Sequence, residues 1–328
     1  MKSCYCFCLN ASAFLLFLTT SCTPRPCASQ DGTVKTTYIH QYGVEVANVD
    51  EWNDRGASGQ IIKHLKNGAT QTELWQQGSL HGLSSTTFPH SNIVHRETYF
   101  DKGARVWQTS HYSSGMPKRQ DIFRPGNITL VSTWYEDGTP RSSEEYHGEN
   151  LWSGEYFTRE QDLETQVAQG NGERIRRDGH GQLLGKDEIE NGKKILEVVY
   201  YPNGMPQKYI PYVNDQVEGT LKTFLPGGEP ATVEEWKKDQ QNGDTTVFRS
   251  GLRVAVIPYV NGQKEGVETG FRPGTDIITE QVTWKADLKH GPCMFYVDQD
   301  KVVEYYFQGQ RVSKIEFAQR ENNASLPY

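Results

Sequence analysis

Acidic residues recur at one position of a repeated pattern in this 328-residue chain, two residues before a large hydrophobic or aromatic side chain. In the N-terminal half they are Asp50, Glu73, Glu97, Asp121 and Glu144, and the same position further on holds Asp187, Glu234 and Glu304. Side chains at i and i+2 of a β-strand share a face, so these carboxylates should flank a row that begins with Trp52, Trp75 and Tyr99. The pattern predicts an acidic strip lined by aromatic rings, which would bind a basic partner through interactions that salt weakens.

Two other roles for these acids remain open. Each carboxylate could pair across strands with a residue such as Lys63 or Thr86, and would then only keep the sheet soluble. Two carboxylates could instead act in a polysaccharide hydrolase, although a repeat predicts evenly spread acids rather than two acids in one cleft. Neighbouring acids would lie roughly 9–10 Å apart, two strands away from each other, which is too far for them to chelate one metal ion.

The remaining chemical motifs are weak. The chain has no Gly-x-Ser-x-Gly elbow, no phosphate-binding loop, no His-Glu-x-x-His and no Cys-x-x-Cys pair. His90 and His95 could share a metal ion only if a loop folded them together. The glycines between Gly179 and Gly185 are spaced one residue too far for a dinucleotide-binding fingerprint, so we interpret this stretch as a turn. The sequence therefore predicts no catalytic residue, no metal site and no cofactor, and a protein that is not an enzyme.

The acids belong to a repeat of 23 to 25 residues that is clearest between residues 212 and 296. Its first aromatic position stands seven residues before a glycine, which stands five before a second aromatic residue. The first aromatic residues of the four clearest copies are Tyr212, Trp236, Tyr259 and Trp284. Extending the pattern outward gives steps of 21 to 25 residues as far as Trp52 and Tyr306. Two aromatic positions separated by glycine turns are typical of one β-hairpin copied along the chain.

Turn signals agree with this interpretation. Asn-Gly and Asp-Gly pairs at Gly68, Gly138 and Gly204 tolerate the positive φ angle that a tight hairpin turn needs. The sequence predicts an all-β fold, an elongated and twisted antiparallel sheet of about 11–12 tandem hairpins of 21–25 residues. No run shows sustained 3.6-residue apolar periodicity and no capped helix start is expected in the repeats, so helix should be scarce. Only residues 159–169 could form a helical turn or two.

The pattern also divides the chain. Residues 38–160 and 189–317 should form N-terminal and C-terminal repeats. Between them, the aromatic positions of residues 161–188 become aliphatic and a charged run intrudes at 173–178. We interpret this segment as a degenerate repeat that bends the sheet or carries a loop. Residues 318–328 would form a tail.

Composition narrows the class of partner. A hydrophobic content of 35% with 31 glycines is lean for a two-layer globule and fits a thin sheet that is wetted on both faces. The formal net charge of −7 argues against a nucleic acid partner and against attraction to anionic lipid head groups. A protein or an envelope polymer is the expected partner.

The N-terminus resembles a bacterial export signal. Residues 1–21 combine Lys2, an apolar run and a cleavage site of small residues. Ser21-Cys22 resembles the end of a lipobox, although Thr19 stands where leucine is usual, so an ordinary secretory leader is the alternative. Residues 22–37 would then tether the fold. The resemblance implies secretion across the inner membrane and anchoring of a lipoprotein in the envelope membrane through Cys22.

The fullest copy of the repeat runs from Tyr259 to Gly274 and reads aromatic, two residues, glycine, three residues, glycine, four residues, aromatic, two residues, glycine. It resembles the MORN repeat, in the variant found in bacterial repeat proteins, and the resemblance extends over about 52–309. This implies a sheet of hairpins used as a scaffold or binding surface, and some bacterial members carry an antitoxin label. We therefore expect a lipid-anchored, non-catalytic scaffold of the bacterial cell envelope. The alternatives are an antitoxin-like neutralising protein and a carboxylate-based polysaccharide hydrolase.

Overall fold

The computed structural model describes residues 32–297 and 300–324 of the chain. Strands account for 65% of the structure and helices for 6%, which confirms the all-β fold class. The predicted signal peptide at 1–21, Cys22 and most of the predicted tether at 22–37 lie outside the described residues, as does the end of the predicted tail. The boundary of the tether is wrong, because its residues 33–37 belong to the first strand of the sheet.

The N-terminal half of the described chain contains one short helix and fourteen strands. In chain order they are β1 (Thr33–His40), β2 (Glu45–Val46), α1 (Val49–Asp54), β3 (Gly59–Leu65), β4 (Thr70–Gln76), β5 (Ser79–Leu80), β6 (Gly82–Thr87), β7 (Val94–Asp101), β8 (Ala104–His111), β9 (Pro117–Arg124), β10 (Ile128–Trp134), β11 (Pro140–His147), β12 (Asn150–Phe157), β13 (Leu163–Ala168) and β14 (Asn171–Arg177).

The C-terminal half continues with fourteen strands and a final helix. They are β15 (Leu183–Glu190), β16 (Lys193–Tyr200), β17 (Pro206–Val213), β18 (Gln216–Val217), β19 (Gly219–Phe224), β20 (Pro230–Lys237), β21 (Gln240–Arg249), β22 (Leu252–Val260), β23 (Gln263–Lys264), β24 (Gly266–Phe271), β25 (Ile278–Lys285), β26 (Leu288–Val297), β27 (Asp300–Phe307), β28 (Gln310–Val312) and α2 (Lys314–Ala324).

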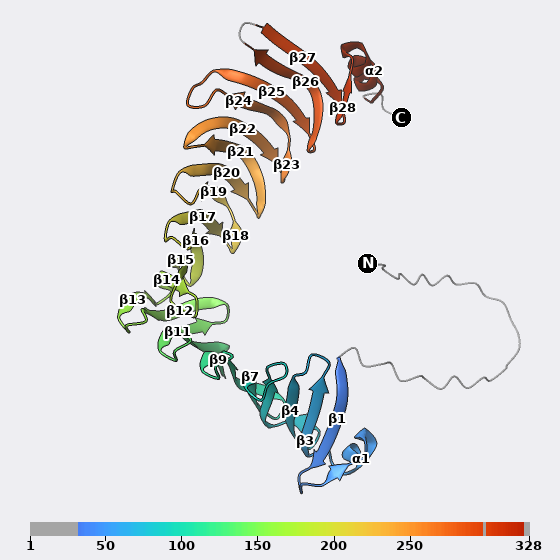
Figure 1. Cartoon of the computed structure of the whole chain (residues 1–328), viewed down its shortest axis with the longest axis vertical. Helices are drawn as coiled ribbons and strands as arrows, with labels where there is room; N and C mark the ends of the chain where they lie inside the picture. The colour runs from blue at the N-terminus through green and yellow to red at the C-terminus, as the bar shows by residue number, and fades with distance from the viewer. Residues whose placement is uncertain (1–31, 298–299, 325–328) are drawn as a thin grey trace, which may run out of the picture.

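The described strands form a single open antiparallel sheet of 28 strands in hairpin-like succession, as the repeat predicts. Figure 1 shows an elongated, curved ribbon with α1 at one end and α2 at the other. The two-residue strands β5, β18 and β23 each continue, after a break, into the strand that follows and pair with the same neighbour. Each strand therefore contacts mainly the strands next to it in sequence, which is the geometry of a repeat array.

A glycine makes the bend inside the longer hairpins possible. Gly243 in β21 has a φ angle of +128°, and a Cβ atom there would come 2.8 Å from Cβ of Glu235. The register between β20 and β21 shifts at this point, between Glu234 and Trp236. Because only glycine combines this φ angle with so close an approach, the spacing of seven residues from Trp236 to Gly243 marks a β-bulge.

Hydrogen bonds tie each hairpin to the next one. Successive turns are linked through the backbone, as where the N–H of Gly262 donates to the carbonyl of Gln241 at 2.8 Å. Tyrosines at the second aromatic position add a link from side chain to backbone. Their hydroxyls donate to a carbonyl 22 or 23 residues further on, Tyr112 to Trp134 (2.9 Å), Tyr135 to Phe157 (2.7 Å) and Tyr201 to Phe224 (2.9 Å). These bonds fix the spacing of neighbouring repeats.

Helices cover both ends of the sheet. Trp52 of α1 is buried with Val46 and Ile61 in a hydrophobic cluster at the N-terminal end. At the other end, Phe317 of α2 packs against the rings of Tyr305 and Phe307. Terminal repeats expose an apolar edge that has no neighbour, so helical caps protect the array from further pairing.

The helices correct one expectation. Residues 49–54 were predicted as a strand and form α1 instead. The side chain of Asn48 accepts a hydrogen bond from the N–H of Glu51 at 2.9 Å, and the Glu51 carboxylate accepts one from the N–H of Ala47 at 2.9 Å. These two bonds cap the first turn of α1, and they outweigh the strand pattern. Residues 314–317, predicted as the end of the C-terminal repeats, and the described part of the predicted tail form α2.

The segment 161–188 contains strands rather than helix. The helical turn expected within 159–169 is wrong, because Leu163–Ala168 forms β13. This strand pairs with β14 over only two residue pairs, Val167 with Gly172 and Ala168 with Asn171. Figure 1 shows that the ribbon changes direction around β12–β15. The sheet thus continues through the segment on a short hairpin.

Candidate binding strip

The strand register brings three of the predicted acids, Glu73, Asp121 and Glu144, onto one face of the sheet. Directly opposed residues of antiparallel strands point to the same side. The paired residues that connect the three acids are Ser84, Thr98, Gln108 and Val131. We call this row of seven residues the strip. Glu73 and Glu144 are six strand spacings apart, which corresponds to roughly 30 Å.

Glu73 lies in the floor of the strip and is already fully bonded. Only 7% of the residue is exposed. Its Oε1 accepts hydrogen bonds from Nζ of Lys63 at 3.0 Å and from Nε2 of Gln71 at 2.7 Å. Its Oε2 accepts one from the indole Nε1 of Trp75 at 3.1 Å. The predicted pairing with Lys63 is therefore confirmed, and little of this carboxylate faces solvent.

Glu144 is held in the same way and is 6% exposed. Its Oε1 accepts a hydrogen bond from the hydroxyl of Tyr156 at 2.9 Å and contacts Nε of Arg174 at 3.0 Å. Its Oε2 accepts one from the hydroxyl of Tyr146 at 3.0 Å. Burial, together with the negative charge of Glu144, raises the pKa of Tyr146 to about 12 and raises that of Tyr156 as well. Both phenols therefore stay protonated and donate to the carboxylate.

A chain of ion pairs leads from Glu144 into the C-terminal half. Asp187, 2% exposed, lies 3.2 Å from Nη2 of Arg176 and 4.0 Å from Nη1 of Arg174. Arg176 also pairs with Glu197, which accepts a hydrogen bond from Nζ of Lys194 at 2.6 Å.

Burial raises the pKa of Asp187, and the two arginines reduce this effect. Burial also acts to raise the pKa of Glu197, but Lys194 and Arg176 outweigh it and lower that pKa below its ordinary value. Alternating charges thus neutralise one another across β11–β16.

Asp121, the third acid of the strip, is partly buried. Its Oδ1 lies 2.7 Å from Nη2 of Arg119, two residues earlier on β9. The residue two positions after it is Phe123, whose ring has no donor, so no bond of the Glu73–Trp75 kind forms here. Instead, the guanidinium of Arg105 lies 5.4 Å from the centre of the Phe123 ring.

Two predicted site residues face away from the strip. In β7 the strip position is held by Thr98, so Glu97 and Tyr99 point to the opposite face. Phe100, two residues after Thr98, takes the aromatic position, and the β-bulge beside it has its extra residue, Val106, on β8. Tyr99 stacks on Trp107 instead, with ring centres 6.0 Å apart. The prediction that Glu97 and Tyr99 belong to the same row as Glu73 is wrong.

Asp50 and Trp52, the first acid and aromatic residue of the predicted row, lie outside the strip as well. Asp50 is exposed in the first turn of α1, where its charge favours the helix N-terminus. Trp52 is buried in the end cluster and Trp75 packs against that cluster. Neither ring forms an open binding surface, so the aromatic lining predicted at Trp52 and Trp75 is structural.

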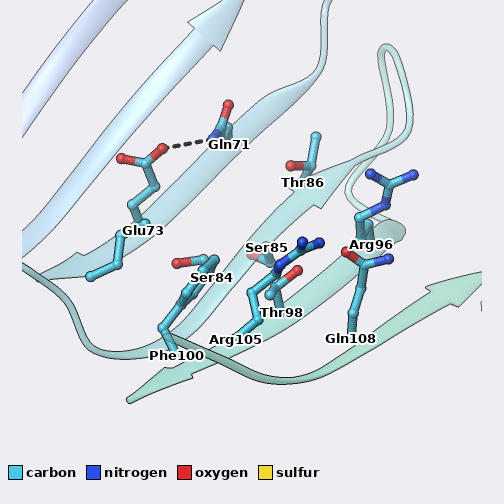
Figure 2. Close-up of a pocket in the computed structure, with 11 residues that line it drawn as sticks. Gln71, Glu73, Ser84, Ser85, Thr86, Arg96, Thr98, Phe100, Arg105 and Gln108 are labelled. Carbon is cyan, nitrogen blue, oxygen red and sulfur yellow. Dashed lines mark hydrogen bonds between the residues drawn. The ribbon is translucent and has the colours of Figure 1, made fainter. Parts of the chain in front are cut away.

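A first open hollow lies over the strip between β4 and β8. It has a volume of about 280 Å³ and is lined mostly by polar side chains. Figure 2 shows Glu73 and Gln71 on one side of it, with Arg96, Arg105 and Gln108 on the other. Arg96 and Arg105 are both exposed. The buried carboxylate of Glu73 thus lies in the floor of the hollow, while the two arginines are open to solvent.

A second hollow, about 240 Å³, lies over Glu144 at the far end of the strip. Five arginines line it, together with Thr133, Ser142 and Tyr156. The arginines are Arg119, Arg141, Arg174, Arg176 and Arg177. Nε of Arg141 donates to Oγ1 of Thr133 at 3.1 Å and its Nη1 donates to the carbonyl of Arg177 at 2.9 Å.

No group of three or more histidines, cysteines, aspartates or glutamates in residues 32–297 and 300–324 could hold a metal ion. His90 lies in a turn with φ of +55°, while the ring of His95 packs on Phe88 at 4.6 Å between centres. Burial and the charges of neighbouring cations lower the pKa of His95. Cys293 is fully buried and its pKa is raised by burial, so it packs as a small apolar side chain. No helix in the described part of the chain is long and apolar enough to cross a membrane.

Sequence reasoning missed the arginines that line both hollows. One signal was present, because Arg174 and Arg176 stand two residues apart and would share a face if the charged run formed a strand, as it does in β14. Arg177 follows on the same strand, and the other four arginines come from separate strands, β7, β8, β9 and β11. Only the observed register, with its bulges, shows that they gather on one side.

No protein-family model and no curated protein matches the chain. Among solved structures, it is similar to TcdB2-TccC3, with 11% identity over 84% of this chain, 18% of that chain and a TM-score of 0.17. TcdB2-TccC3 without its hypervariable C-terminal region is 12% identical over 86% of this chain and 18% of that chain, with a TM-score of 0.16. A porin-like protein from Bacteroides uniformis gives 11% identity, coverage of 77% and 87%, and a TM-score of 0.12. The chain spans under a fifth of the TcdB2-TccC3 chain.

Proposed function

We propose that this protein is a non-catalytic, MORN-like repeat scaffold that is anchored in the bacterial cell envelope through a lipid on Cys22 and binds an extended partner along the strip. The observation that carries the proposal is the pair of open, polar hollows over Glu73 and Glu144, on one face of an open sheet. An open surface of this length can contact a partner at several points, as repeat arrays do.

The state of the acids supports binding rather than hydrolysis. Glycosidases place two carboxyl groups roughly 5–10 Å apart. Asp121 and Glu144 are two strand spacings, roughly 10 Å, apart, but Arg119 pairs with Asp121 and Arg174 with Glu144. Glu73 and Glu144 are roughly 30 Å apart. Each accepts hydrogen bonds from an aromatic side chain and a cation, so each has a structural role. A toxin-neutralising role remains an alternative within the same binding class and would require a protein partner.

Blocking the hollows tests the proposal. The variant Thr86→Trp with Ser142→Trp would fill both hollows with indole rings and leave the charge unchanged. Ser143→Trp is the matched control, because Ser143 is exposed on the opposite face of β11, next to Ser142.

The immobilised mature chain should capture a component from envelope extract, the double variant should lose it, and the control should keep it. Absence of capture by the parent chain, or equal capture by the double variant, would contradict the proposal.

A further inference from the structure

The strip offers positive charge to solvent, although it was predicted from its acids. Seven arginines line the two hollows, against two glutamates. The arginines are Arg96 and Arg105 in the first hollow, and Arg119, Arg141, Arg174, Arg176 and Arg177 in the second. Glu73 and Glu144 lie below them, buried and already bonded. A basic partner would therefore meet like charge at both hollows.

Three of these arginines have guanidinium N–H donors that no carboxylate in the described chain occupies. Within the described part of the chain, the side chains of Arg96 and Arg105 form no hydrogen bond and no ion pair. Arg141 bonds only to a hydroxyl and a backbone carbonyl, which orient its guanidinium without neutralising it. A guanidinium has five N–H donors and binds carboxylate or phosphate oxygens in pairs. These residues can accept an anionic group without first breaking a salt bridge.

The uncharged side chains of the first hollow indicate which class of molecule would carry the carboxylate or phosphate groups. Hydroxyl and amide groups surround the arginines of the first hollow, from Ser85, Thr86, Thr98, Gln71 and Gln108 (Figure 2). Such groups both donate and accept hydrogen bonds, as sugar hydroxyls require. An extended peptide would instead use a free sheet edge or apolar side-chain pockets. The strip lies on the face of paired strands, and the apolar side chains are few, Leu80 and Phe100 in the first hollow and Ile175 and Leu184 in the second.

From these observations, and on the basis of the proposed scaffold function, we infer that the strip binds a linear acidic polysaccharide. Carboxylate or phosphate groups of the polymer would bind to Arg96 and Arg105 at one hollow and to Arg141 at the other, three to four strand spacings or roughly 15–20 Å away. Binding at two hollows on one chain would raise the apparent affinity for a polymer above that for a single sugar acid.

The test measures binding of the mature chain to polygalacturonate, a linear polymer with one carboxylate per sugar, at low and moderate salt. The parent should bind, and raising the salt concentration from 0.05 to about 0.5 M should weaken binding, since screening shortens the range of charge interactions. The triple variant Arg96→Gln, Arg105→Gln and Arg141→Gln should bind at least tenfold more weakly. None of the three forms an ion pair, so the variant leaves no carboxylate without its cation.

The matched control removes the same amount of charge elsewhere. Arg124, Arg249 and Arg272 are exposed and lie outside both hollows, and their replacement by glutamine should leave binding within twofold of the parent. Equal losses in the two triple variants would overturn the inference, as would absence of binding by the parent. Binding of poly-glutamate as tight as that of polygalacturonate would also overturn it in favour of an acidic peptide.

A separate outcome would distinguish the inference from the proposed function. If an envelope component is captured equally by the parent and by the arginine triple variant, but not by the variant with filled hollows, the scaffold proposal stands and the acidic polysaccharide is wrong.

Discussion

The indole Nε1 of Trp236 donates a hydrogen bond of 2.8 Å to Oε2 of Glu234, two residues earlier on β20. The same relationship recurs along the sheet, from Trp75 to Glu73 (3.1 Å), Tyr146 to Glu144 (3.0 Å) and Tyr306 to Glu304 (2.9 Å). Trp284 breaks the pattern, because Val282 occupies the acid position and Nε1 of Trp284 is buried without a partner. Acid and aromatic residue thus form a structural unit within one strand.

Because Trp236 has a hydrogen-bond acceptor and Trp284 has none among the described residues, replacing each by phenylalanine should lower the free energy of unfolding by different amounts. Trp236→Phe would leave Glu234 with one donor fewer and should cost about 1–3 kcal/mol beyond the smaller ring. Trp284→Phe removes a buried donor that has no acceptor, so it should cost clearly less. Hydrogen exchange of amides in β20–β21 and β25–β26 measures both effects locally, as suits an array. Equal destabilisation by the two variants would show that the hydrogen bond contributes nothing.

The ion pair below the second hollow should matter for stability. Glu144→Ala would leave Arg174 without its nearest carboxylate and two tyrosine hydroxyls without an acceptor, at a cost of about 3–5 kcal/mol. The control is Glu145→Ala, since Glu145 points to the other face, pairs with His147 near the surface and should contribute less than about 1 kcal/mol. Urea unfolding followed with probes in β11–β14 would compare the two, and similar midpoints would contradict the structural role of Glu144.

Glu197 gives a pH dependence with a defined sign. Because Lys194 and Arg176 lower its pKa in the folded protein, the unfolded state binds more protons between that pKa and the ordinary value of 4.5. The stabilisation that the Glu197 carboxylate contributes to the fold is fully present above pH 4.5. It is lost as the pH falls through the pKa of Glu197 in the folded protein. Glu197→Gln should therefore reduce the loss of stability between pH 5 and pH 3.

Asp187 provides the control for this pH dependence. Its raised pKa gives the opposite sign, so its contribution is lost as the pH rises through the folded pKa. Asp187→Asn should steepen the acid loss that Glu197→Gln reduces. Unfolding midpoints of the parent and both variants, recorded across this pH range, would check the pair, and shifts of the same sign would contradict the assignment.

Anchoring through Cys22 can be tested without touching the fold. Cys22→Ser should move the mature chain from the membrane fraction to the soluble fraction, because a serine cannot carry the thioether-linked lipid. The strip and its hollows begin far from residue 22 in the chain, so partner capture by the soluble variant should be unchanged. Co-fractionation of the variant with membranes would argue for an ordinary secretory leader.

The repeats were predictable because their determinants are local. Gly138 and Gly204 follow Asp and Asn in turns that need a positive φ angle, and Gly243 occupies a bulge that only glycine fits. The helical caps could also have been found, since Asn48 with Glu51 and Ser313 with Glu316 carry the spacing of a capping box.

The sequence did not predict which face of the sheet each side chain points to, or which residue it pairs with. Tyr99 and Phe100 are adjacent aromatic residues, and taking Tyr99 as the repeat position placed Glu97 on the strip face, whereas β6 pairs Ser84 with Thr98. The salt bridge between Glu144 and Arg174 joins residues 30 positions apart through a sheet whose curvature is a property of many strands. The acids were therefore identified correctly as a recurring feature, while their burial and their arginine partners required the structure.

The succession of neighbouring hairpins has a mechanical consequence. Bonds between strands run perpendicular to the strands and therefore along the long axis of the ribbon. Tension between α1 and α2 would load the strand pairs in series, so we expect the hairpins to peel open one after another at low force. A protein that links a membrane to an extended polymer through such a ribbon would lengthen under load and recover its length when each hairpin closes again.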